Sequence, residues 1–225
     1  MKKVRVEDTS VFSSLPWWVA RDEGLFIEEG LEIEFIRVGG AGPTNGADPT
    51  VTDWNSVSST RGHASLLEQG VADMYWGCEW GNYRRAQDSK VSGLQVGRRA
   101  SMACGAIIVP PWSDVYTPQQ LANKVIGVPF HAGTHYLTLQ MLEGFLPRDL
   151  IKVCDASGRA SGRFHALMSH EVDACSVVEP WITYAEKVGC RIIIQGFYNG
   201  TEAVNPDVVD AETLAAINRA VSKAV

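Results

Sequence analysis

The sequence predicts an α/β fold with mainly parallel sheets. From residue 125 onwards, short apolar segments alternate regularly with longer segments that have one apolar face. This alternation is typical of parallel strands, because two such strands need a helix-length crossover between them. The length of 225 residues is enough for one large domain or two small lobes. The expected strands here are 125–129, 151–155, 173–178 and 190–195, and the expected helices are 134–146, 159–170, 181–188 and 210–225.

The first part of the chain follows the same rule less regularly. "KVRVED" alternates apolar and polar residues, and "LEIEFIRV" does so with β-branched residues, so both are expected as strands. Between them, "LPWWVARDEGLFIEEG" predicts a helix with Pro16 in its first turn and Gly24 or Gly30 near its end. The expected strands of this part are 2–8, 31–38, 72–80 and one or two within 93–111, and the expected helices are 15–30, 60–70, 81–87 and 117–124.

Residues 39–60 form a long segment with no predicted element. The segment reads "GGAGPTNGADPTVTDWNSVSST" and is rich in residues that favour turns. A loop of this length inside a compact domain is usually a functional lid or a mobile connection. We therefore expect it to influence the shape of any binding pocket.

Charge and hydropathy exclude two classes of partner. The net charge of −6 and the pI near 5.4 argue against nucleic acid, which is bound by a basic face. No apolar run approaches the length of about 18 residues that a membrane-spanning helix needs, so we expect no membrane span.

The five cysteines favour a reducing compartment. They are scattered and form no CxxC pair, which argues against a zinc finger or ribbon. The start "MKKVRVEDTS" has basic residues but no apolar segment after them, so it is not a secretory signal. We expect a cytoplasmic protein, unless a signal ahead of residue 1 has been removed, in which case a periplasmic or lipid-anchored protein is expected. The cysteines are Cys78, Cys104, Cys154, Cys175 and Cys190.

Four motifs occur in an order that resembles a known family. The motifs are "ARDEGLFIEEGLEIEFI" (20–36), "LLEQGVADMYWG" (66–77), "YTPQQLANKVIGVPFHAGTHYLTLQMLEGF" (116–145) and "FHALMSHEVDACSVVEPWITYAEKVGC" (164–190). Together they are similar to the substrate-binding proteins of ABC importers for sulfonates, taurine, nitrate and thiamine-precursor pyrimidines. The resemblance covers nearly the whole chain.

The resemblance implies the type II periplasmic-binding-protein fold, with two α/β lobes around a ligand cleft. By this resemblance, residues 1–101 form lobe one, residues 196–225 return to it, and residues 102–195 form lobe two. The implied partners are a small-molecule ligand and an ABC permease, and no cofactor or metal is implied. Members of this family are usually longer, so the final helices and the return strand are expected to be missing or minimal. Lobe one would then be incomplete or completed by a second chain in a homo-oligomer.

The segment "HAGTHY" is the strongest candidate for ligand contact. A helix start presents free backbone N–H groups and the positive end of the helix dipole. Gly133 allows close approach and Thr134 adds a hydroxyl, which suits a carboxylate, sulfonate or phosphate. The alternative is that Thr134 only caps the helix.

A metal site is the second interpretation of this segment. His131 and His135 are four residues apart, but His131 precedes the expected helix and no carboxylate lies between them. We favour one histidine facing the cleft as a hydrogen-bond donor and the other in ordinary packing.

Two further segments end predicted strands and should face the same cleft. In "VVEPWITYAEK", Trp181 either walls the cleft or packs the helix on the sheet, and Glu179 is expected to have a structural role in the lobe or its hinge. "YWGCEWGNYRR" brings Trp76, Cys78 and Glu79 to a strand end. Cys78 is either a nucleophile activated by neighbouring cations or a small residue among aromatic ones.

Two remaining segments add candidates for ligand contact. Arg61 lies near a helix start and either reaches an anion or is solvated. Ser13, Ser14 and Trp17 follow the first strand, while Trp18 is expected in the core.

Two functions from different classes follow from these residues. The first is a binding protein that holds a small organic anion or an aromatic heterocycle between two lobes. The alternative is a leaderless cytoplasmic enzyme on the same fold, a decarboxylase, desulfinase or hydrolase acting on a small aromatic acid. Cys78, His63 and His135 would then be the catalytic candidates.

Overall fold

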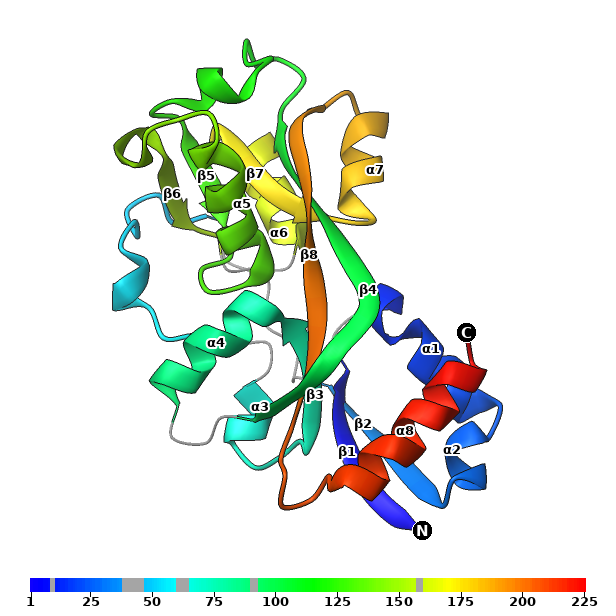
Figure 1. Cartoon of the computed structure of the whole chain (residues 1–225). Coiled ribbons are helices and arrows are strands. Elements are labelled where there is room, and N and C mark those ends of the chain that lie inside the picture. The colour runs from blue at the N-terminus through cyan, green and yellow to red at the C-terminus, as the bar shows by residue number, and fades with distance from the viewer. Residues whose placement is uncertain (9–10, 38–46, 60–64, 90–92, 157–159) are drawn as a thin grey trace.

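The computed structural model describes residues 1–8, 11–37, 47–59, 65–89, 93–156 and 160–225 (Figure 1). The strands are β1 (Lys2–Asp8), β2 (Leu31–Arg37), β3 (Met74–Cys78), β4 (Leu94–Val109), β5 (Val125–Val128), β6 (Lys152–Asp155), β7 (Ala174–Val178) and β8 (Arg191–Val204). The α-helices are α1 (Val11–Asp22), α2 (Leu25–Glu28), α3 (Ser65–Glu68), α4 (Glu79–Asp88), α5 (Gly133–Glu143), α6 (Ala160–Met168), α7 (Trp181–Lys187) and α8 (Ala211–Lys223). Short 3-10 helices are η1 (Trp54–Ser56), η2 (Pro118–Leu121) and η3 (Arg148–Leu150).

The strands form one mixed sheet in the order β2-β1-β3-β8-β4-β7-β5-β6. β1 pairs in parallel with β2 and β3, and β5 pairs in parallel with β6 and β7. The long strands β4 and β8 pair antiparallel to one another and run through the middle of the molecule (Figure 1). β3 and β5 run in opposite directions, and the helices that follow them, α4 and α5, begin close to one another.

Buried apolar side chains gather on both sides of this middle. The terminal core is built from both ends of the chain, and the central core consists of buried apolar residues between Ala106 and Cys190. Within the described residues, no helix combines the length and the apolar content that a membrane crossing needs. The buried members of the terminal core are Val4, Val6, Trp17, Ala20, Phe26, Leu31, Met74, Trp76, Val204, Val209, Ala216, Ile217 and Ala220.

The return strand that the short tail put in doubt is present. β8 continues past Gly196, pairs with β3 from Met74↔Val204 to Cys78↔Gly200, and leads into α8. The strand expected at 190–195 is therefore longer in the structure, where it spans Arg191–Val204. In the structure, a Cβ at Gly196 would lie 2.9 Å from the Met141 sulfur, so this glycine is where α5 packs closely on β8.

Two other expected elements differ from the structure. The segment 15–30, predicted as a helix with Gly24 or Gly30 near its end, is divided into α1 and α2, because Gly24 adopts the left-handed conformation with φ 71°. Pro16 lies inside α1 rather than in its first turn. The region 93–111 contains one long strand, β4, and the helix expected at 117–124 is the shorter η2.

Candidate functional site

The starts of α4 and α5 meet at the middle of the sheet. A Cβ added to Gly133 would lie 2.7 Å from the Cys78 Cβ and 2.7 Å from a ring carbon of Tyr198 on β8. A Cβ at Gly81 would lie 2.9 Å from both the Cys78 sulfur and the His131 carbonyl oxygen. Glycine therefore permits a contact between two helix starts and β8 that any side chain would obstruct. The predicted candidates Cys78 and Gly133 are brought together here.

The start of α5 carries no side-chain cap. Ala132 occupies the N-cap position and has no side-chain oxygen, so Thr134 is not the capping residue that the alternative interpretation required. By contrast, Cys78 caps α4 by accepting a hydrogen bond from the Gly81 N–H at 3.1 Å. The first amides of α5, at Gly133 and Thr134, are therefore those best suited to an anion.

Cys78 lacks the environment of a nucleophilic cysteine. Burial raises the pKa of its thiol to about 11. The nearby Arg85 guanidinium opposes this effect only weakly. At neutral pH the residue is a thiol, whereas nucleophilic attack requires the thiolate. These properties count against the catalytic role considered for Cys78.

His135 is buried and neutral rather than a base in a cleft. Its side chain has no exposed surface and contacts the rings of Phe130, Trp54 and Tyr136. Burial, together with the nearby positive charges, lowers its pKa to about 3. Its Nδ1 accepts the backbone N–H of His131 at 3.2 Å. These contacts count against the predicted ligand or catalytic role of His135.

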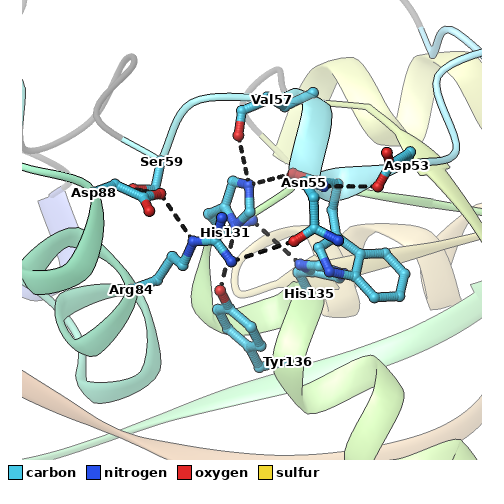
Figure 2. A network of polar contacts seen from close by, with 10 residues as sticks. Asp53, Asn55, Val57, Ser59, Arg84, Asp88, His131, His135 and Tyr136 are labelled. Atoms are coloured by element: carbon cyan, nitrogen blue, oxygen red, sulfur yellow. Dashed lines mark hydrogen bonds and ion pairs between the residues drawn. The ribbon is translucent and has the colours of Figure 1, made fainter.

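His131 binds the segment that precedes α3 instead of facing a ligand. Its Nε2 lies 2.8 Å from the carbonyl oxygen of Trp54 and 2.9 Å from that of Val57. Since carbonyl oxygens only accept, Nε2 carries a hydrogen. Its Nδ1 lies 3.3 Å from the Tyr136 hydroxyl (Figure 2). Both ring nitrogens are thus engaged, and the two histidines do not form a chelating pair.

Glu179 and Trp181 serve the start of α7. The Glu179 carboxylate accepts the backbone N–H of Thr183 at 3.2 Å and its hydroxyl at 3.1 Å. The Trp181 ring packs against Phe164 and Tyr184, each with ring centroids 5.4 Å away. These contacts give Trp181 the packing role that was the alternative to ligand contact.

The remaining candidates from the first part of the chain are distributed between the core and the site. Trp17 and Trp76 are buried in the terminal core with ring centroids 5.6 Å apart, so neither presents a face to a ligand. Trp18, which was expected in the core, is half-buried. Ser14 is buried and donates to Asp8 at 3.2 Å. Glu79, the first residue of α4, is buried. Arg61, His63 and the side chain of Ser13 lie outside the described residues.

Two residues near the helix starts were not predicted. Arg163 on α6 is buried and donates from Nε to the carbonyl oxygen of Ser176, in the middle of β7, at 2.6 Å. Burial lowers its pKa to about 10, so it is a cation at neutral pH. Tyr198 is close enough to influence this pKa, and burial raises the pKa of its own phenol. A basic residue in the first turn of a helix interacts unfavourably with the helix dipole. The position of Arg163 in the first turn of α6 was therefore the sequence feature that could have indicated a special role for this residue.

Comparison with known proteins identifies the fold. No family model matches this sequence, and no curated protein matches it. The alkanesulfonate-binding protein SsuA from Xanthomonas axonopodis pv. citri, bound to MOPS, is similar over 100% of this chain and 73% of its own, with TM-score 0.71 and 17% identity. This chain has the periplasmic-binding-protein fold.

Other structures with the periplasmic-binding-protein fold support the same assignment. The Candida albicans CA3427 gene product, described as exhibiting the generic periplasmic binding protein fold, matches 100% of this chain and 71% of its own, with TM-score 0.74 and 15% identity. The aliphatic sulphonate binding protein SsuA from Escherichia coli matches 99% of this chain and 69% of its own, with TM-score 0.62 and 15% identity. The predicted fold class is confirmed.

Proposed function

We propose that the protein binds a small organic anion or an aromatic heterocycle of the sulfonate, carboxylate or pyrimidine type between two lobes. Lobe one would comprise residues 1–101 and 196–225, and lobe two residues 102–195. The protein would deliver its ligand to an ABC permease. The observation that carries this proposal is the uncapped start of α5, which faces α4 and β8 in a periplasmic-binding-protein fold.

Charge and ring contacts around this helix start support an anionic ligand with an apolar part. The amides of Gly133 and Thr134 can donate to an anion, and the helix dipole favours its charge. Arg163 is a buried cation close to Tyr198. The Tyr198 ring contacts Gly133 directly and can pack on a flat or apolar ligand group. Among the similar structures, alkanesulfonate-binding proteins have ligands of this chemistry.

In the described conformation, the start of α5 is in close contact with the start of α4 and with β8, so the proposed ligand site is closed. Because Gly133 already contacts Cys78 and Tyr198, the starts of α4 and α5 must separate before a ligand can lie between them. Ligand entry therefore requires the two lobes to move apart, as in hinge closure around a bound molecule.

The proposal is tested with a panel of alkanesulfonates including MOPS, aromatic carboxylates and pyrimidines. Melting temperature reports binding to the folded state, and mass analysis of each recovered compound reports any reaction. We expect at least one compound to raise the melting temperature and to return unchanged. A compound that returns altered would instead support the enzyme alternative.

Thr134→Val is expected to weaken binding of an anion found in this panel by at least ~1 kcal/mol, about fivefold in Kd. The change removes a hydroxyl beside the uncapped amides and keeps the side-chain shape. Thr138→Val is the matched control, because its hydroxyl donates to the Thr134 carbonyl oxygen one turn further along α5. Titration calorimetry measures both variants, and equal affinities would place the anion elsewhere.

A further inference from the structure

Residues 47–59, called the strap here, cross from one part of the molecule to the other. In sequence the strap lies between β2 and α3, yet its apolar side chains pack against the central core. Its backbone pairs with the end of β6: the Asp48 N–H donates to the Asp155 carbonyl oxygen, and the Asp155 N–H donates to that of Val51, both at 2.9 Å. Figure 1 shows the strap in cyan beside β6 and α5.

The contacts between the strap and the central core combine partly buried apolar side chains with hydrogen bonds to the strap backbone. The ring of Trp54 lies 5.5 Å from that of His135 and 6.4 Å from that of Phe130, and the Arg148 guanidinium lies over it at 4.8 Å. The His131 imidazole donates to two strap carbonyl oxygens. Backbone pairing, ring packing and a buried imidazole together anchor the strap to this side.

The described contacts between the strap and α4 join polar side chains and include no ring packing or backbone pairing; Ser59 is buried and Asn55 is exposed. The Ser59 hydroxyl donates to the Asp88 carboxylate at 2.7 Å, and Arg84 Nη1 donates to the Asn55 side chain at 3.4 Å. Arg84 also pairs with Asp88 along the helix at 2.8 Å. These four residues are called the latch (Figure 2).

α4 itself belongs with the terminal side of the molecule. The Asn82 amide donates to Thr201 on β8 at 2.6 Å, and its oxygen accepts the Tyr75 hydroxyl of β3 at 2.8 Å. Arg85 pairs with Glu68 of α3 at 2.7 Å. The latch therefore joins a helix held on one side to a strap anchored on the other.

We propose that the strap moves together with the central core and that the latch holds the two sides closed. When the sides separate, the contacts of Ser59 and Asn55 with α4 break, while those of Trp54 and His131 remain. One hydrogen bond of this kind changes an equilibrium constant by about fivefold, which is enough to shift a closed and an open population that are close in free energy. This device would set how readily the site opens, and it is independent of the ligand's identity.

The opposite arrangement, in which the strap moves with α4, would require different contacts to break. Separation would then expose the Trp54 ring and break the backbone pairing between the strap and Asp155. The apolar packing of the strap on the central core and its backbone pairing with Asp155 disfavour this course.

The test uses the full chain without ligand. Asp88→Ala removes the acceptor of Ser59 and the partner of Arg84, and it replaces the last residue of α4 with a good helix former. Ser59→Ala removes the strap's part of the same contact. Gln87→Ala is the control, an exposed change at the neighbouring position of the same helix. Trp54→Ala removes the anchor.

Small-angle X-ray scattering measures opening, and hydrogen exchange measures whether the strap stays docked. We expect Asp88→Ala and Ser59→Ala to increase the radius of gyration relative to Gln87→Ala, while the amides of Asp48 and Asp155 keep their protection. Trp54→Ala should remove that protection. An unchanged radius of gyration in both latch variants would overturn the proposal. Loss of protection at Asp48 in the latch variants would also overturn it, because the strap would then move with α4.

Discussion

At the residue scale, His131 and His135 are four positions apart and both contact the strap. His131 has φ 65°, a left-handed conformation that histidine adopts more readily than most side chains. Its backbone N–H thereby reaches His135 Nδ1, and its ring reaches the strap carbonyl oxygens. The next residues, Gly133 and Thr134, are left with amides that no side chain caps. One short segment thus anchors the strap and starts the helix proposed to bind the ligand.

The buried neutral state of His135 predicts a pH dependence of stability. Its pKa falls from an ordinary 6.5 in the unfolded chain to about 3 in the folded protein. Between these values the unfolded state binds one more proton, so the free energy of unfolding falls as the pH drops below about 6.5. The slope from this residue is at most about 1.4 kcal/mol per pH unit.

Comparison with His135→Asn isolates this contribution, because acidic groups elsewhere titrate equally in both proteins. Urea denaturation between pH 7 and 4 should show a steeper loss of stability in the original protein than in the variant. Parallel curves would show that His135 can be protonated in the folded protein without a loss in the free energy of unfolding.

At the element scale, α4 is positioned by its buried face. Asn82 links Tyr75 of β3 to Thr201 of β8, and Arg85 donates through Nη1 to both Glu68 oxygens at 2.7 and 2.8 Å. These side chains fix the position of α4, so that its start beside Cys78 lies at the candidate site. Another face of α4 carries the latch residues Arg84 and Asp88. A ten-residue helix therefore serves as the support of both the site and the latch.

Arg85→Ala is expected to lower the free energy of unfolding by about 3 kcal/mol, because it leaves the Glu68 carboxylate mostly buried without this cation. Glu68→Ala should also destabilise the protein. The double variant should cost less than the sum of the two single changes, since neither charge then lacks a partner. Urea denaturation of the four proteins measures this coupling, and additive losses would show that the ion pair does not stabilise α4.

At the scale of the whole molecule, the two ends of the chain meet in one core. β8 pairs with β3, and α8 buries Ile217 and Ala220 among residues of β1, α1 and β3. α8 begins with a side-chain cap, in which the Asp210 carboxylate accepts the Thr213 N–H at 2.8 Å. The last helix is therefore part of the same folding unit as the first strand.

Ile217→Ala is expected to lower the free energy of unfolding by about 2–4 kcal/mol, because it leaves a cavity in the terminal core. Ile27→Ala is the matched control, since Ile27 is 64% exposed on α2. Chemical denaturation should show a small change, within about 0.5 kcal/mol, for the control. Similar losses in both variants would contradict the packing of α8 on the first part of the chain.

The sequence by itself determined the elements whose signals are local. Alternation and β-branched content were sufficient to predict β1, β2, β5, β6 and β7, and the motif order was sufficient to predict the fold class. Sequence also located the start of α5 beside Gly133. These features depend on the properties of neighbouring residues, which a sequence displays directly.

Only the tertiary structure decided which side chains face the site. Trp17 and His135 are residue types that often contact ligands, but both are buried by packing against rings that lie far away in the sequence. Arg163 and Tyr198 approach the site because of strand pairing and helix packing between segments far apart in sequence. The sequence predicted the strap as a loop but not its position, because that position depends on contacts with α4 and α5, which lie far from it in the sequence. Long-range contacts of this kind have no local signal in the chain.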